Sequence, residues 1–134
     1  MSNRRNRSNI VQTAVDDGRF ETLVTALENT GLDDVLEGNG PFTVFAPLDQ
    51  AFAEVDLNRV SERQLQNILK YHVVAGYFPA SDLQSVLRLK SVEGSPLKIR
   101  ARNGGITVNG NPVQVADVKA SNGVIHVIDT VLMP

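Results

Sequence analysis

The spacing of apolar residues changes partway along the chain, and this change limits the possible folds more than any other feature. Before residue 73, apolar residues recur at intervals of three and four, which is typical of helices with one buried face. From residue 86 onward they alternate with polar residues, which is typical of strands with one buried face. Helices followed by antiparallel strands indicate an α+β protein with a sheet-on-sheet core.

Several helices are expected in the first half of the chain. The first begins at a Ser8 cap and ends at Gly18. Its apolar face holds Ile10, Val11, Ala14 and Val15. The second ends at Gly31. Its apolar face holds Phe20, Leu23, Val24 and Leu27. A short helical turn is expected in LDDVLEGNG and a strand in PFTVFAP. After Pro47, Asp49 can cap a short helix that carries Ala51 and Phe52.

The clearest helix begins at Ser61, which forms a capping-box pair with Gln64. Its apolar face holds Leu65, Ile68, Leu69 and His72. His72 is therefore expected to point into the core at the end of the helix, where its ring can bond a free carbonyl group. Tyr71 lies off this face, and we expect it to be partly exposed.

Two hairpins and one central strand are predicted in the second half. VLRLKSV and LKIRARN alternate around the turn EGSP, and ITV and PVQVADV flank Asn109-Gly110, a strong hairpin signal. The last segment, VIHVID, is apolar on both faces except at His126. A strand of this kind is expected at the centre of the sheet, covered on both sides.

Length and composition favour one ordinary domain. The 134 residues are 42% hydrophobic and contain no cysteine, which excludes disulfides, thiol catalysis and cysteine-based zinc sites. No apolar run approaches the roughly 20 residues that a membrane-spanning helix requires. We expect a disordered basic tail over residues 1–8 and a single domain over residues 9–134. No apolar segment typical of a signal peptide follows the arginines of this tail.

The chain contains none of the common motifs for catalysis or nucleotide binding, such as Gly-x-Ser-x-Gly, a P-loop, His-Glu-x-x-His or Gly-x-Gly-x-x-Gly. His72 and His126 could meet and recruit Asp49 or Asp129 to form a catalytic dyad. Both histidines lie on apolar faces, however, where a polar group is normally kept as a satisfied hydrogen-bond partner. We therefore favour structural roles for His72, His126 and Asp49, and expect no catalytic residue, metal or cofactor.

Five cations of the first hairpin are expected on one sheet face, because alternate residues of a strand share a face. They are Arg88, Lys90, Lys98, Arg100 and Arg102. Such a face can serve only to keep the strands soluble and unpaired, or it can dock an acidic polysaccharide or protein. Nucleic acid is disfavoured as a partner, because the net charge is −2 and the hairpin contains no aromatic residue for base stacking.

Three segments resemble conserved blocks of fasciclin-like domains. GPFTVFAPLDQAF is similar to the first homology block, NILKYHVVAG to the Tyr-His block and ASNGVIHVIDTVLMP to the second homology block, in the same order and spacing. The resemblance covers residues 9–134 and implies a wedge of two antiparallel sheets with helices packed around it, mostly in the N-terminal half. It also implies a non-enzymatic module for cell adhesion or matrix association, located outside the cell, on its surface or in the periplasm.

The resemblance also suggests contact residues. Asp117-Val118 matches an integrin-linked Asp-Ile pair of animal members, with Val in place of Ile. Tyr71-His72 matches a Tyr-His pair that is discussed as an adhesion motif in this family. Tyr71 is therefore a candidate contact residue, whereas His72 is expected to face the core and to support the surface structurally. Leu48 replaces a residue that is usually polar, which leaves helix capping to Asp49. We expect the chain to be a monomer. The implied partner is a cell-surface or matrix protein such as an integrin-like receptor, and the alternative partner is an acidic polysaccharide.

Overall fold

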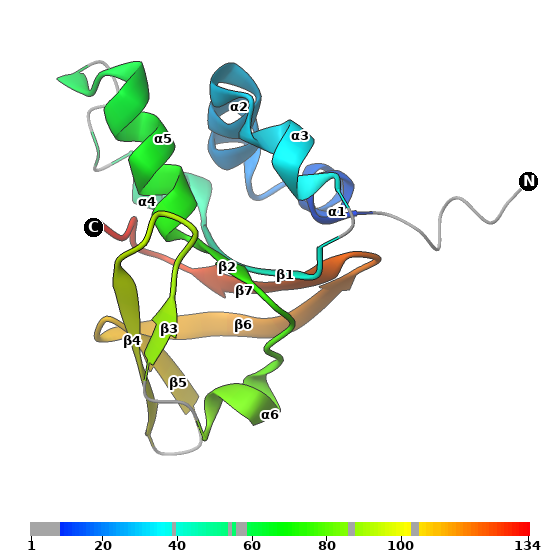
Figure 1. Cartoon of the computed structure of the whole chain (residues 1–134), viewed down its shortest axis with the longest axis vertical. Coiled ribbons are helices and arrows are strands. Elements are labelled where there is room, and N and C mark those ends of the chain that lie inside the picture. The colour runs from blue at the N-terminus through cyan, green and yellow to red at the C-terminus, as the bar shows by residue number, and fades with distance from the viewer. Residues whose placement is uncertain (1–8, 39, 54, 56–58, 86–87, 103–104) are drawn as a thin grey trace, which may run out of the picture.

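The computed structural model describes residues 9–38, 40–53, 55, 59–85, 88–102 and 105–134. The basic tail predicted over residues 1–8 lies outside this part of the chain. The helices are α1 (Ile10–Asp17), α2 (Glu21–Thr30), α3 (Leu32–Leu36), α4 (Asp49–Phe52), α5 (Glu62–Tyr71) and α6 (Ala80–Leu83). Helices α1 to α5 form a layer on one side of the strands, whereas α6 lies at the far end of the molecule (Figure 1). The predicted concentration of helices before residue 73 is confirmed.

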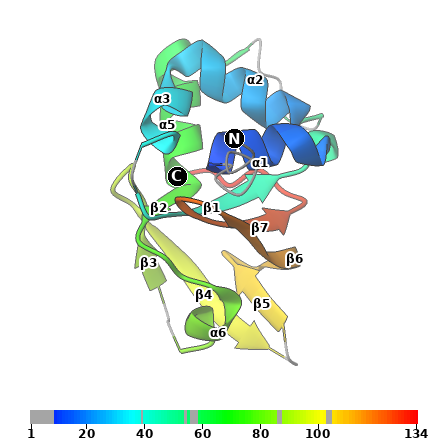
Figure 2. The same ribbon diagram turned by 90° about the vertical axis from the view of Figure 1, so that its right-hand side faces the viewer.

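The described residues form seven strands, and buried and exposed residues alternate clearly in β3 and through most of β4. The strands are β1 (Phe42–Pro47), β2 (Val73–Ala75), β3 (Arg88–Lys90), β4 (Pro96–Arg102), β5 (Gly105–Val108), β6 (Asn111–Ala120) and β7 (Gly123–Ile128). They pair in the order β2-β1-β7-β6-β5-β4-β3. The long strand β6 pairs with β5 through its first residues and with β7 through the remainder, so it joins the two halves of the wedge (Figure 2).

Both predicted hairpins and the α+β class are confirmed. Arg88 pairs with Lys98 between β3 and β4, and Asn109-Gly110 forms the turn between β5 and β6. Asn109 and Gly110 have φ of 52° and 87°, as a two-residue hairpin turn of this kind requires. The pairing departs from a purely antiparallel arrangement in one place, because β1 and β7 run parallel, with Phe42 opposite Gly123.

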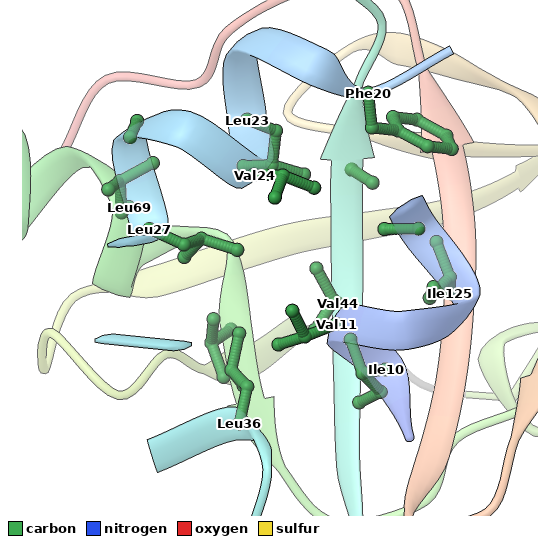
Figure 3. Packing of buried hydrophobic residues seen from close by; sticks show 14 of the residues in the cluster. Ile10, Val11, Phe20, Leu23, Val24, Leu27, Leu36, Val44, Leu69 and Ile125 are labelled. Atoms are coloured by element: carbon green, nitrogen blue, oxygen red, sulfur yellow. The ribbon is translucent and has the colours of Figure 1, made fainter. Parts of the chain in front are cut away.

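Two apolar clusters lie on opposite faces of the central strands. One cluster fills the space between the helical layer and strands β1 and β7, and includes Leu23, Val44 and Ile125 (Figure 3). The other lies between the two halves of the wedge and includes Phe45 and Ile128. All six residues of β7 are buried, so the prediction of a central strand covered on both sides is confirmed.

Two details of the first helix differ from the prediction. The side chain of Asn9, not Ser8, caps α1 by accepting a hydrogen bond from the Gln12 N–H at 2.8 Å. Val15 is 49% exposed, because the helix buries only the narrower face formed by Ile10, Val11 and Ala14.

Asp49 caps a different helix from the one predicted. It lies within α4, and its Oδ1 accepts a hydrogen bond from the Thr22 N–H at 2.8 Å. Thr22 is in the first turn of α2, whose own N-cap residue, Phe20, provides no side-chain bond. The half-buried carboxylate therefore joins two helices that are distant in sequence, which local capping rules could not reveal.

Asn122 is a structural centre to which the sequence analysis assigned no role. Its Oδ1 accepts from the Ile10 N–H at 3.0 Å, and its Nδ2 donates to the carbonyl oxygens of Leu36 and Gly38 at 2.6 and 2.8 Å. The next residue, Gly123, packs so closely that a Cβ would collide with the Phe42 carbonyl oxygen. Asn122 therefore holds the ends of α1 and α3 against the central strands.

Candidate functional site

His72 is a buried strut, as its position in the helix predicted. It is 1% exposed; its Nδ1–H donates to the Ile68 carbonyl oxygen at 2.7 Å, and its Nε2 accepts from the Leu132 N–H at 2.9 Å. Burial lowers the pKa of His72 to about 4, although the bond to the carbonyl opposes this change. The neutral ring therefore ties the end of α5 to the C-terminal segment.

Tyr71 is buried as well, so the expectation that it is partly exposed is wrong. Its side chain is 5% exposed, packs in the cluster between the two halves of the wedge, and donates its hydroxyl proton to the Pro96 carbonyl oxygen at 2.9 Å. The same hydroxyl oxygen accepts from Asn109 Nδ2 at 2.9 Å. The helical periodicity missed this burial because the end of α5 lies between two apolar clusters: Leu69 packs in one of them and Tyr71 in the other.

His126 has backbone partners on both sides of its ring. It is fully buried; its Nε2–H donates to the Phe78 carbonyl oxygen at 2.9 Å, and its Nδ1 accepts from the Asp117 N–H at 3.3 Å. Burial lowers the pKa of His126, while the Phe78 carbonyl and the nearby Asp117 charge act in the opposite direction. His126 and His72 are thus neutral rings of opposite tautomer.

The two histidines do not form the dyad that was considered. Each ring bonds backbone groups instead, and Asp129 accepts from Gln114 Nε2 at 3.3 Å. Within the described residues, no three His, Asp or Glu side chains converge on a position where they could hold a metal ion. The arrangement suits neutral hydrogen-bonding struts better than acid–base chemistry.

Asp117 is exposed, as expected of a contact residue, and lies in an irregular part of β6. The register with β7 shifts between Val115 and Val118, and Asp117 has a φ of 59°. Its Oδ1 accepts from the N–H of Ala80, the first residue of α6, at 2.8 Å. Val118 is half-buried and packs against the apolar cluster between the helical layer and strands β1 and β7. Asp117 therefore combines exposure with a structural bond, whereas Val118 belongs mainly to the core.

Three side chains fix the segment that follows β2. Buried Thr43 donates through Oγ1 to the Gly76 carbonyl oxygen at 2.8 Å and accepts from the Phe78 N–H at 2.9 Å. His126 bonds the Phe78 carbonyl, and Asp117 bonds Ala80, so residues 76–80 are anchored beside the irregular part of β6. Tyr77, within this segment, stays 42% exposed.

We call Tyr77, Val115 and Asp117 the bulge surface. Val115 is 40% exposed, so residues 76–80 and the neighbouring irregular part of β6 expose an aromatic, an aliphatic and an acidic side chain. Sequence reasoning found Asp117 but missed Tyr77. Its only signal was an aromatic residue directly after Gly76, in a segment without clear periodicity.

The cationic face is confirmed for four of its five predicted members. Arg88, Lys90, Lys98 and Arg100 are exposed. The intervening residues Leu89, Leu97 and Ile99 are buried. The side chain of Arg102 lies outside the part of the chain that the structure describes. Among the described residues, none of these four cations forms an ion pair, and Arg19 pairs with Asp17 elsewhere.

An open hollow of about 280 Å³ lies beside two of these cations. It is lined by Lys98, Arg100, Thr107, Asn109 and Gly110. Asn109 is fixed on both sides, because its Oδ1 accepts from the Lys98 N–H at 2.8 Å and its Nδ2 donates to Tyr71. The sequence marks Asn109 only as a turn residue and gives no signal of this lining role.

Within the described residues, no helix has the length and apolar character needed to cross a bilayer.

Residues 18–134 match a family model described as the fasciclin domain. An uncharacterized protein of Synechocystis sp., sll1735, is 48% identical, with 93% of this chain and 97% of that protein covered.

Two further relatives extend the comparison. Transforming growth factor-beta-induced protein ig-h3 from Sus scrofa is 41% identical over 88% of this chain, but the match spans only 18% of that protein. A solved pair of FAS1 domains from the insect cell adhesion molecule Fasciclin I has a TM-score of 0.79 and 20% identity, with 95% of this chain and 51% of that chain covered. This last likeness is one of fold.

Proposed function

Because the chain belongs to the fasciclin domain family, we propose that it is a non-enzymatic module for cell adhesion or matrix association. The proposed partner is a cell-surface or matrix protein, such as an integrin-like receptor. The proposed location is outside the cell, on its surface or in the periplasm. We further propose that residues 9–134 act as one monomeric domain. The description of the insect relative as a cell adhesion molecule supports this function.

The observation that carries the proposal is the construction of the bulge surface. Protein contacts gain most from a few large side chains held in place before binding, because less conformational entropy is then lost. Tyr77 is such a side chain, and its segment is anchored by Thr43, His126 and Asp117. Only Oδ1 of Asp117 bonds another described residue, which leaves the carboxylate a second oxygen for a partner.

The surroundings of the titratable groups support a binding role over catalysis. Both histidines are buried, burial lowers the pKa of each ring, and both rings have backbone partners, while Asp49 joins two helices. A general acid or base must reach its substrate, and these side chains are enclosed by the fold.

Cell attachment to surfaces coated with the protein tests this function. Asp117→Asn removes the charge but keeps an oxygen that can accept from Ala80, so the fold should be retained. We expect this variant to support clearly less attachment than the wild type. Asp34→Asn, which removes an exposed charge from the helical layer, is the matched control and should attach normally. If neither cells of the source organism nor animal cells attach to surfaces coated with the wild-type protein, the proposed function is contradicted.

A further inference from the structure

We propose that the cationic face of β3 and β4 binds an acidic polysaccharide, with the hollow beside Lys98 and Arg100 receiving one of its sulfate or carboxylate groups. This polysaccharide would be a second class of matrix partner beside the proposed protein receptor. The inference rests on the proposed function only in placing the chain where such polysaccharides occur. The binding site itself is argued from the charges and geometry of the strands.

The first argument is the arrangement of like charges. Arg88 and Lys98 lie directly opposite each other across the β3–β4 pair, and both side chains are exposed. Like charges at opposed positions destabilise a sheet, and no described carboxylate forms an ion pair with either cation. A bound anion would relieve this repulsion and gain attraction from both cations.

The second argument is spacing. Alternate residues of a strand are roughly 7 Å apart, and neighbouring strands lie roughly 5 Å apart. Lys98 and Arg100 therefore form one row, with Arg88 and Lys90 in a second row on the adjacent strand. This regular array can contact successive charges of an extended polymer, whereas a single small anion would use only part of it.

The third argument is the hollow. Its lining places the hydroxyl group of Thr107 and the polar turn of Asn109 and Gly110 next to two cations. A charged sugar presents an anionic group beside hydroxyl groups, so this mixture of cations and polar groups matches its chemistry. Asn109 is already held by Tyr71 and the backbone of Lys98, so this wall of the hollow needs no rearrangement to bind.

The charge distribution explains why a chain with a net charge of −2 can bind an anion. Residues 1–71 hold 11 acidic residues and seven cations, a net charge of −4, whereas residues 88–102 hold five cations and one acid, a net charge of +4. The first segment contains α1 to α5 and the second contains β3 and β4, and these two groups of elements lie in different parts of the molecule (Figure 1). A polyanion is therefore guided to the strand end and repelled by the helices.

Among anionic polymers, the face favours a polysaccharide over a single-stranded nucleic acid. Sequence-tolerant nucleic acid binding depends on aromatic side chains that stack on bases, and β3, β4 and β5 contain none. The recognition elements here are cations and polar groups, which sugars satisfy without stacking.

Binding of the full chain to purified heparin, with uncharged dextran as the comparison, tests the inference. The double variant Lys98→Gln/Arg100→Gln should bind heparin about tenfold more weakly, since two ionic contacts are lost. Arg63→Gln/Lys119→Gln removes the same net charge at exposed positions elsewhere and should bind within about twofold of the wild type. Circular dichroism and urea unfolding confirm that both double variants are folded.

Three results would overturn the inference: no heparin binding by the wild type at low salt, equal losses in the two double variants, or equal binding of heparin and dextran. Preferential binding to vesicles of anionic lipid, dependent on Lys98 and Arg100, would also overturn it in favour of a membrane surface. Because these measurements need no cells, their failure is distinct from a failure of the attachment assay.

Discussion

The hydroxyl oxygen of Tyr71 lies 2.9 Å from Asn109 Nδ2, so a buried residue at the end of α5 positions a turn that lines the cationic hollow. The same hydroxyl donates to the Pro96 carbonyl at the start of β4. Tyr71 thus affects the surface from inside the molecule. A residue that resembles part of an adhesion motif can alter binding without ever contacting a partner.

Tyr71→Phe removes both hydrogen bonds but keeps the ring. We expect the free energy of unfolding to fall by about 1–2 kcal/mol, because two partly buried polar groups lose their partner. Urea unfolding measures this loss. Tyr77→Phe is the matched control, because the exposed Tyr77 should change stability by less than about 0.5 kcal/mol. Equal stabilities of the two variants would show that the Tyr71 bonds contribute nothing.

His72→Ala should lower the free energy of unfolding by about 2–5 kcal/mol. The substitution leaves the buried Ile68 carbonyl and Leu132 N–H unsatisfied and also creates a cavity. A fall in the urea midpoint would account for any loss of attachment. Unchanged stability with abolished attachment would instead identify His72 as a contact residue.

Stability should also depend on pH through His72. Its folded pKa of about 4 is below the unfolded value of 6.5, so between these values the unfolded chain binds more protons. Its contribution is therefore complete above about pH 6.5 and declines as the pH falls toward 4, by about 3 kcal/mol in total. His126 acts in the same direction.

Urea unfolding between pH 7 and 5 measures this dependence, in a range where most carboxylates remain ionised. A folded His72→Gln variant should show a clearly smaller decline in stability over that range. A variant with the same slope as the wild type would contradict the assignment of this pH dependence to the buried ring.

Asn122→Ala should destabilise the attachment of α1 and α3 to the central strands. It removes the acceptor for the Ile10 N–H and the donor to Leu36 and Gly38, so we expect a loss of about 2–4 kcal/mol. Asn29→Ala, at an exposed position of α2, should change stability by less than about 0.5 kcal/mol. Urea unfolding of both variants checks the difference, and similar midpoints would contradict this role for Asn122.

The parts of the fold that local patterns determine could be predicted from the sequence. The capping box of Ser61 and Gln64 is present as expected, and the alternation in the first hairpin correctly placed Arg88 and Lys98 on an exposed face. The Asn109-Gly110 turn followed from the positive φ that both positions require. Each of these features depends on residues close together in the sequence.

The features that could not be predicted depend on contacts between distant segments. Asp49 bonds a residue 27 positions away, and Asn122 bonds one 112 positions away. The burial of Tyr71 depends on residues distant in sequence, such as Pro96, whose carbonyl accepts from its hydroxyl. The hollow depends on which side chains of β4, β5 and the turn after β5 lie together. Periodicity defines the buried face of an element but not the elements that cover it.

Attachment by the double variant Tyr77→Ser/Asp117→Asn tests the adhesion account most directly. Wild-type and variant proteins are coated in equal amounts, and their urea unfolding is measured on the same preparations. We expect the variant to unfold within about 1 kcal/mol of the wild type, because both changed side chains are exposed, and to lose most of its cell attachment. Attachment equal to that of the wild type, with the fold intact, would contradict the assignment of adhesion to the bulge surface.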